Sequence, residues 1–358
     1  MITVVGLGPA GLDRVSAESR GALLDPLVDV LVRTAHHPAA VELAEMRSIS
    51  SGDDLYESSD DFETVYESLA QRVISMAAND ADVVYAVPGS PLVGERSVTA
   101  LRQLARDGGL ELRVLAAESF LDLCFDRVGV DPIADGAQIL DGRNLPDPMP
   151  LHLPTLITQV DGPVLLGDVA ATLGRVLEDD HPVVVLRGLG SASEVVERST
   201  LGEVASVEVD VRTTLFVPAA EVGWLGLVAT NRTLRRECPW DAEQTHHSLL
   251  KHLVEEAYET VDAITALPPQ APGGEVDYVA YSAFEDELGD LLLQVVFHST
   301  LANEVGAFDV EQVAEIVRRK LVRRHPHVFG DVAVGTAGEV LVNWEVIKAE
   351  EKQRESLM

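Results

Sequence analysis

The sequence has little of several residue types, and each shortage excludes a class of protein. Only two of its 358 residues are cysteine, which is too few for a disulfide framework. Basic residues number 27 against 59 acidic ones, and the formal net charge of -32 would repel the phosphate backbone of duplex nucleic acid. No apolar run has the length of a membrane span, and no basic segment or hydrophobic signal core stands at the N-terminus. We therefore expect a cytoplasmic protein that binds neither duplex nucleic acid nor a membrane.

The hydropathy pattern changes along the chain, which has room for two domains. Short apolar runs at residues 82–87, 112–115 and 181–186 resemble the one that opens the sequence, and helical stretches lie between some of them. Alternation of strand and helix predicts an α/β domain with a largely parallel sheet. Helical periodicity dominates the C-terminal third. The fold class expected is a multidomain chain: an α/β domain over 1–217, a linker over 218–224 and an all-α domain over 225–358.

The C-terminal third contains two pairs of closely spaced carboxylates. From 247 to 267, apolar residues recur at spacings of three and four, which predicts an amphipathic helix with one buried stripe. Glu256 and Glu259 lie about 60° apart around that helix, so both carboxylates can reach one ion. Glu255 lies four residues before Glu259 and is also within reach.

The second pair, Glu287 and Asp290, borders the apolar stripe of another predicted helix, over about 282–302. If the two helices pack antiparallel through their stripes, all four carboxylates flank the seam. Such crowded like charges repel strongly, and a bound hard cation such as Mg²⁺ is the usual remedy. The alternative is a solvated acidic helix face, which is the default for either pair alone.

A basic and aromatic group follows the carboxylates. Lys320 and Arg324 share a face of a helix predicted over 308–324, and Trp344 and Lys348 have the same spacing on a helix predicted over 339–352. These cations can donate to a polyphosphate, and the indole offers a flat surface for a nucleobase. Trp344 as an ordinary core aromatic remains an alternative. Together with two acidic pairs, the group favours phosphate chemistry.

Several motifs closely resemble the MazG nucleoside triphosphate pyrophosphohydrolases, over roughly residues 225–352. The matching segments are Cys238-Pro239-Trp240-Asp241, Gln244-Thr245-His246, 255–259, 287–298, 320–329 and Asn343-Trp344-Glu345. The resemblance implies an all-α domain that forms a homodimer and uses Mg²⁺ to hydrolyse nucleoside triphosphates to nucleoside monophosphate and pyrophosphate, as nucleotide-pool housekeeping.

The resemblance also implies roles for individual residues. The metal ligands are expected to be Glu256, Glu259, Glu287 and Asp290, with Glu255 as a fifth catalytic carboxylate that orients water or binds a second ion. The nucleotide contacts are expected at Lys320, Arg324, Trp344 and Lys348, and the width of the pocket at Trp240 and Trp344 is expected to set base selectivity.

Two glycine-containing turns, at residues 6–11 and 86–91, follow strand-like runs in the N-terminal domain. Together with segments 117–122 and 186–190 they resemble the tetrapyrrole methylases, which bind S-adenosylmethionine between two α/β lobes; the likeness spans about residues 1–217. Ala10 and Ser90 depart from the pattern of relatives, which disfavours methyl transfer. The alternative is that these glycines serve only tight turns. The expected cofactor-binding residues are Gly6, Gly8, Pro9, Gly11, Pro88, Gly89 and Ser90.

Three functions are therefore compared. The first is an active nucleoside triphosphate pyrophosphohydrolase, favoured because metal, phosphate and base contacts are all present. The second is an S-adenosylmethionine-dependent methyltransferase whose helical domain senses nucleotides. The third is a regulatory module that binds nucleotides without turnover, which the intact acidic group disfavours.

Overall fold

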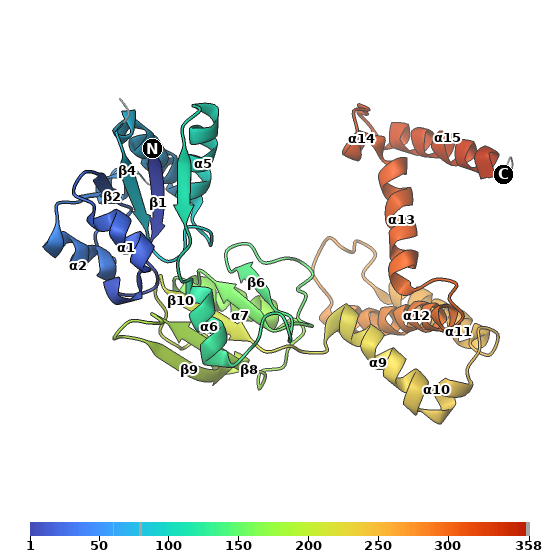
Figure 1. Ribbon diagram of the computed structural model, residues 1–358. Helices are drawn as coiled ribbons and strands as arrows, with labels where there is room; N and C mark the ends of the chain where they lie inside the picture. The colour runs from blue at the N-terminus through green and yellow to red at the C-terminus, as the bar shows by residue number, and fades with distance from the viewer. Residues whose placement is uncertain (60, 79–80, 356–358) are drawn as a thin grey trace. The chain divides into compact units, whose positions relative to one another are not determined.

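The computed structural model describes residues 1–59, 61–78 and 81–355 and divides the chain into two units, Met1–Ala220 and Glu221–Met358. The division falls within the segment 218–224 that was expected to be a linker, and the last three residues of the expected C-terminal domain lie outside the described residues. The first unit is α/β and the second is helical (Figure 1), which confirms the fold class.

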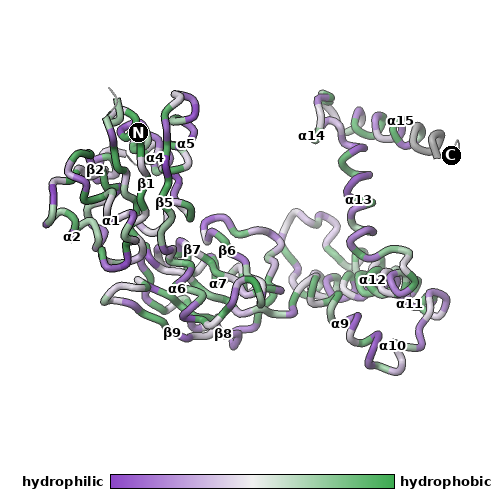
Figure 2. Tube along the Cα trace, in the orientation of Figure 1, coloured by the Kyte–Doolittle hydropathy of each residue, from purple (hydrophilic) through white to green (hydrophobic). Residues whose placement is uncertain are grey.

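The first sheet of the N-terminal unit is parallel throughout, with strand order β3-β2-β4-β1-β5. Its central strands are buried on both faces, as continuous apolar runs in a parallel sheet require, and they appear as hydrophobic segments in Figure 2. The strands are β1 (Ile2–Gly6), β2 (Asp29–Val32), β3 (Ser50–Ser51), β4 (Val83–Val87) and β5 (Leu112–Leu115).

Helices cover both faces of this sheet. Leu23 of α1 and Leu43 of α2 join the core on one face, and Val73 of α4 and Leu101 of α5 pack around Tyr85 on the other. This arrangement leaves the loops at the carboxyl ends of the strands to form a site. The bounds are η1 (Leu12–Arg14), α1 (Ala17–Leu24), α2 (Pro38–Met46), α3 (Asp53–Glu57), α4 (Phe62–Met76) and α5 (Arg96–Asp107).

The second sheet of this unit is mixed, with strand order β6-β7-β10-β8-β9. Only β6 and β7 pair in parallel among its described strands, and the other pairs are antiparallel. The sequence pattern did not predict this second sheet: the run at 181–186, expected in a largely parallel sheet, is β8, and both of its neighbours are antiparallel to it. Its elements are β6 (Gln138–Asp141), β7 (Thr155–Thr158), β8 (Pro182–Arg187), β9 (Val195–Thr200), β10 (Thr213–Val217), α6 (Phe120–Val128), α7 (Pro163–Leu173) and α8 (Leu201–Val204).

The C-terminal unit is built from helices around a small core in which Val228, Val296 and Val310 meet. Arg235 bonds Glu304 at 2.6 Å, which ties the first helix of the unit to the longest one. Among the described residues, no helix combines the length and apolar character needed to cross a membrane. The helices are α9 (Gly223–Glu237), α10 (Pro239–Glu243), α11 (Leu250–Ala266), α12 (Tyr278–Glu304), α13 (Val310–Arg324), α14 (Pro326–Phe329) and α15 (Ala337–Glu355).

The four helices expected from periodicity are present as α11, α12, α13 and α15, but the prediction of a buried apolar stripe on the first of them was wrong for a single chain. Val254 and Val261 of α11 are each 53% exposed, and Ile316 of α13 is 58% exposed. The cause is that the described elements of the unit do not cover these faces. Contiguous apolar surface of this kind marks a site of association.

Gly6 fixes the approach of the loops that follow β1 and β4. A Cβ at this position would lie 2.4 Å from the Ala117 Cβ and 2.5 Å from the Gly89 carbonyl oxygen. Gly167, within α7, has no atom within 4 Å of such a Cβ and has no positive φ.

We expect Gly6→Ala to lower the free energy of unfolding by about 2 kcal/mol, because the added methyl overpacks backbone that cannot move freely. The control Gly167→Ala should raise the stability by about 0.5–1 kcal/mol, because alanine is the better helix former. Urea unfolding followed by circular dichroism measures both changes. An unchanged midpoint for Gly6→Ala would contradict the close approach.

Candidate metal and nucleotide site

The carboxylate-bearing helices α11 and α12 meet at Thr260. This buried residue has its hydroxyl 3.2 Å from the Glu287 carbonyl oxygen across the seam and 2.7 Å from the Glu256 carbonyl oxygen on its own helix. Thr260 therefore fixes the register in which the two helices present their acidic residues.

Three carboxylates converge at this seam. Glu256, Glu287 and Asp290 each offer an oxygen within 4.8 Å of the others. Hard divalent cations take such oxygens, and Mg²⁺ usually keeps several waters and adds substrate phosphates to a few carboxylates. The donor set fits Mg²⁺, with room in its coordination shell for water and a polyphosphate.

The electrostatics of the cluster indicate uncompensated negative charge. Burial and then the charges of Asp290, Glu259, Glu255 and Glu287 raise the pKa of Glu256 above its ordinary value. Burial and the neighbouring charges, Glu259 first, also raise the pKa of Glu287. A cation between the helices would remove this cost, because it favours the ionised forms.

The other two carboxylates expected in the site stand outside the cluster. Glu259 is exposed and acts on Glu256 and Glu287 through its charge, but the close cluster does not include its carboxylate. Glu255 is also exposed, with its Oε2 3.6 Å from His252 Nδ1. Metal ligation by Glu259 and a catalytic role for Glu255 stay predictions.

The expected nucleotide contacts form a second cluster on α13 and α15. The Arg324 guanidinium carbon lies 6.0 Å from the centroid of the Trp344 ring, and Lys348 Nζ lies 5.6 Å from it. Trp344 Nε1 is buried and has no hydrogen-bond partner in the described part of the chain, and Lys320 is exposed one turn before Arg324. Two cations beside an indole can bind phosphate and hold a base by stacking.

Trp240 does not belong to that second cluster. It is exposed on α10, and its ring centroid lies 6.0 Å from that of His252 at the start of α11. The structure therefore places Trp240 beside α11 at His252, which lies one helical turn before Glu255 and Glu256.

A single chain holds the two clusters apart. α13 begins at Val310, which packs on Val296 of α12, and its 15 residues span about 22 Å before Arg324. Figure 1 shows α13 leading away from α12, with α15 at its far end.

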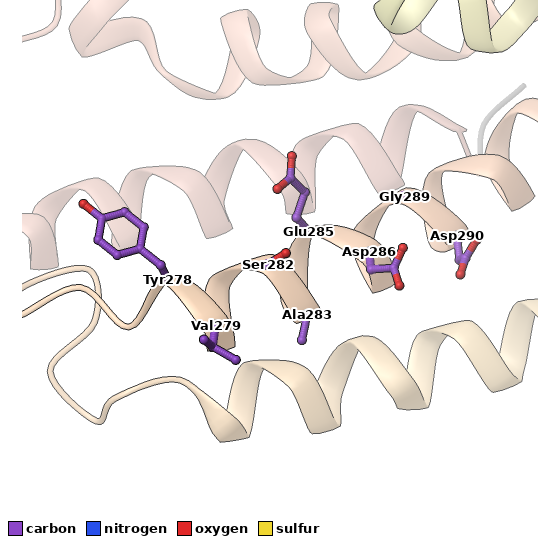
Figure 3. Close-up of a pocket in the computed structure, with 8 residues that line it drawn as sticks. All are labelled: Tyr278, Val279, Ser282, Ala283, Glu285, Asp286, Gly289 and Asp290. Atoms are coloured by element: carbon purple, nitrogen blue, oxygen red, sulfur yellow. The ribbon is translucent and has the colours of Figure 1, made fainter. Parts of the chain in front are cut away.

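A groove of about 760 Å³ along α12 was not predicted from the sequence. It contains Asp290 of the metal cluster, and Figure 3 shows that its lining side chains all project from α12. These residues lie on the same helix as Asp290, and their spacing from it could have identified them in the sequence. The lining residues are Tyr278, Val279, Ser282, Ala283, Glu285, Asp286, Gly289 and Asp290.

The pairing of His246 with His298 was also missed, because the two residues are far apart in sequence. Their Nδ1 atoms lie 2.8 Å apart and their rings are nearly parallel, at 5°. A hydrogen bond between two imidazoles needs one neutral ring as acceptor, and burial, followed by the charge of His246, lowers the pKa of His298. The pair connects α12 with the segment that precedes α11.

In the N-terminal unit, the expected cofactor residues gather at the carboxyl ends of β1 and β4. Gly8 and Gly89 exchange two backbone hydrogen bonds, of 3.1 and 2.8 Å. Gly6 packs so closely on Ala117 that there is no room for a side chain at this position. Beside Gly11, the Glu42 carboxylate accepts a hydrogen bond from the Leu12 amide at 3.1 Å.

The same region meets the second sheet, where a Cβ on Gly190 would lie 3.5 Å from Pro9 Cγ and 3.6 Å from Ala10 Cβ. Ser90 is buried and accepts from the Leu92 amide, while Gly89 faces open space. The amides of Gly8, Gly89 and Leu12 are thus already paired within the protein. Binding of S-adenosylmethionine by the seven residues stays a prediction, and no methyl-transfer step follows from them.

We expect the acidic cluster to bind Mn²⁺, used as a spectroscopic substitute for Mg²⁺, with an affinity that falls as the pH is lowered. Because the pKa values of Glu256 and Glu287 are raised above 4.5, both groups hold protons at a pH where ordinary glutamates have lost them, and a metal must displace these protons. Electron paramagnetic resonance titrations from pH 8 to pH 5 measure the change. Affinity independent of pH would contradict carboxylate ligation.

Comparisons with known proteins agree with this division of the chain. Residues 244–329 match the MazG nucleotide pyrophosphohydrolase domain, and residues 1–205 match the tetrapyrrole (corrin/porphyrin) methylases. The chain is 37% identical to the uncharacterized protein YabN of Bacillus subtilis, over 98% of this chain and 71% of that protein.

Other relatives match one part only. The nucleoside triphosphate pyrophosphohydrolase/pyrophosphatase MazG of Thermotoga maritima is 46% identical over 32% of this chain and 39% of its own length. The crystal structure of uroporphyrin-III-C-methyltransferase from Thermus thermophilus is 17% identical, covering 64% of this chain and 97% of that one, with a TM-score of 0.48. The methylase match covers more than half of the chain, which therefore belongs to the tetrapyrrole (corrin/porphyrin) methylase family and carries a MazG nucleotide pyrophosphohydrolase domain in its C-terminal third.

Proposed function

We propose that the C-terminal unit hydrolyses nucleoside triphosphates to nucleoside monophosphate and pyrophosphate in a Mg²⁺-dependent reaction that serves nucleotide-pool housekeeping. The observation that carries the proposal is the convergence of Glu256, Glu287 and Asp290 within 4.8 Å. The similar Thermotoga maritima protein is named as a nucleoside triphosphate pyrophosphohydrolase, which supports the substrate class.

The acidic residues have separate tasks in this proposal. Glu256, Glu287 and Asp290 would hold Mg²⁺, which supplies charge neutralisation at the phosphates and a more acidic water when bound. Glu259 lies beside the cluster without being part of it, so its carboxylate can accept a proton from the attacking water. Glu255, next to His252, would orient that water.

The second cluster would bind the rest of the nucleotide. Arg324 and Lys348 lie beside the Trp344 ring, where they can stabilise negative charge on the departing pyrophosphate. Trp344 would stack on the base, and its unpartnered Nε1–H is a donor for an acceptor on the substrate. Lys320 adds a further cation at the exposed surface of α13.

A homodimer resolves the separation of the two clusters. The about 22 Å length of α13 keeps Arg324 away from α12 in one chain. The exposed apolar faces of α11 and α13 would be covered by a second copy, whose α15 could then approach the carboxylates. We propose that each site takes its acidic cluster from one copy and its Arg324–Trp344–Lys348 cluster from the other.

The alternative, a methyltransferase with a nucleotide-sensing helical domain, has less support. It requires the glycine loops to receive S-adenosylmethionine, but Gly8 and Gly89 bond each other and Glu42 occupies the amide of Leu12. Family membership is the observation in its favour. Measurable methyl transfer without nucleotide turnover would establish it over the hydrolase.

The test is pyrophosphate and orthophosphate release from a panel of ribo- and deoxyribonucleoside triphosphates, with Mg²⁺ and with chelator. We expect Mg²⁺-dependent pyrophosphate release, and a roughly 100-fold lower kcat for Glu259→Gln because its amide cannot take the proton. Glu275→Gln, at an exposed position in the loop before α12, is the matched control and should retain full activity. Wild-type turnover by Glu259→Gln would refute the role of this carboxylate, and no release from any substrate would refute the function.

A further inference from the structure

The three tyrosines of the N-terminal unit all lie near one arginine, Arg33. Tyr56, Tyr66 and Tyr85 all lie within electrostatic range of the Arg33 guanidinium. Arg33 directly follows β2, and its amide donates to the Ala86 carbonyl of β4 at 2.8 Å. The cluster therefore stands at the carboxyl ends of two adjacent parallel strands, where open α/β sheets bind ligands.

One carboxylate of the cluster is fully engaged within the protein. Glu95 accepts from Arg33 Nη1 at 2.8 Å and from the Ser97 hydroxyl at 2.7 Å, and Tyr85 in turn lies 2.7 Å from that hydroxyl. The Glu95 side chain is 3% exposed and that of Arg33 is 24% exposed. Glu95 is thus more deeply buried than Arg33, so a ligand from solvent would meet the guanidinium before the carboxylate.

Two hydrogen-bond donors in the cluster have no partner among the residues that the structure describes. They are Arg33 Nε and the Tyr56 hydroxyl, and both atoms are buried. Burial raises the pKa of Tyr56 to about 12, so its hydroxyl keeps its proton. Buried donors are paired in most proteins, and two such exceptions around one arginine require an explanation.

The unpaired edge of Arg33 has a defined chemical preference. Glu95 occupies Nη1, which leaves the side of the guanidinium formed by Nε and Nη2. Two parallel N–H groups on one edge match the two oxygens of a carboxylate or phosphate. The Tyr56 hydroxyl lies within electrostatic range of the same guanidinium and adds a third donor, so an acceptor that reaches both groups would satisfy all three.

The nearby histidine does not compete for this role. Burial lowers the pKa of His37 to about 4, so its ring is neutral near pH 7. Its Nδ1 accepts from the Ala39 amide, and its ring also bonds the backbone of Gly8. His37 therefore connects the loop after β2 to the loop after β1, which steadies the backbone beside Arg33.

We propose that Arg33 and Tyr56 form a binding site for the carboxylate or phosphate group of a small molecule, at the carboxyl ends of β2 and β4. The site is separate from the acidic cluster of the C-terminal unit and does not depend on hydrolysis. With a formal net charge of -32, the chain repels anions in general, so an anion that binds here does so through a specific arrangement of donors.

The test is isothermal titration of the full chain with inorganic phosphate and, separately, with acetate, at constant ionic strength set with sodium chloride. We expect saturable binding of one of the two anions, and which one binds distinguishes a phosphate from a carboxylate ligand. Tyr56→Phe removes a single hydroxyl and should weaken binding roughly tenfold. Arg33→Lys keeps the charge beside Glu95 but loses the two-pronged edge, and should weaken binding further.

The control is Arg72→Lys, because Arg72 pairs with Asp54 at the surface of the same unit. It should bind the anion as the wild type does. Equal affinity in all four proteins would mean an adventitious ion only and would overturn the site, as would the absence of binding by the wild type. Circular dichroism shows whether each variant is folded, and Tyr56→Phe keeps the test open if Arg33→Lys is not.

Discussion

Repulsion among three carboxylates at the seam of α11 and α12 is the constraint on which the C-terminal unit depends. Glu256, Glu287 and Asp290 are held together by helix packing and by the bond from Thr260 to the Glu287 carbonyl oxygen, although their charges oppose the arrangement. Burial and then the neighbouring charges raise the pKa values of Glu256 and Glu287, and the second of these causes expresses that cost. A divalent cation would remove this repulsion, so the cluster is suited to bind one. The function then follows from the substrate that the bound cation would attract.

Periodicity and spacing were sufficient to predict the elements that carry this chemistry. The helices α11, α12, α13 and α15 occur where three- and four-residue spacing placed them, because that spacing is a local property of the chain. Spacing along a helix could not tell that Glu259 would stand outside the cluster, since this depends on the rotation of α11 against α12. The Arg33–Glu95 pair and the His246–His298 pair were invisible for the same reason: each joins residues far apart in sequence.

The exposed apolar faces explain why sequence and single-chain structure disagree about burial. An amphipathic stripe shows that a helix has an apolar partner, but it does not say whether the partner lies in the same chain. Val254, Val261 and Ile316 are half exposed in the described residues. The pattern and the structure agree if a second copy covers these faces, and the same association would bring the Arg324–Trp344–Lys348 cluster to the carboxylates.

Mixing two inactive variants tests the central claim most directly, since it asks whether one active site needs both clusters and two copies. Glu256→Gln removes a metal-binding carboxylate, and Trp344→Ala removes the stacking surface; each should be inactive alone. If the clusters act across copies, mixed dimers contain one intact site, and equal mixing after subunit exchange should recover about a quarter of the wild-type pyrophosphate release. No recovery in dimers shown to have exchanged subunits would contradict the shared site.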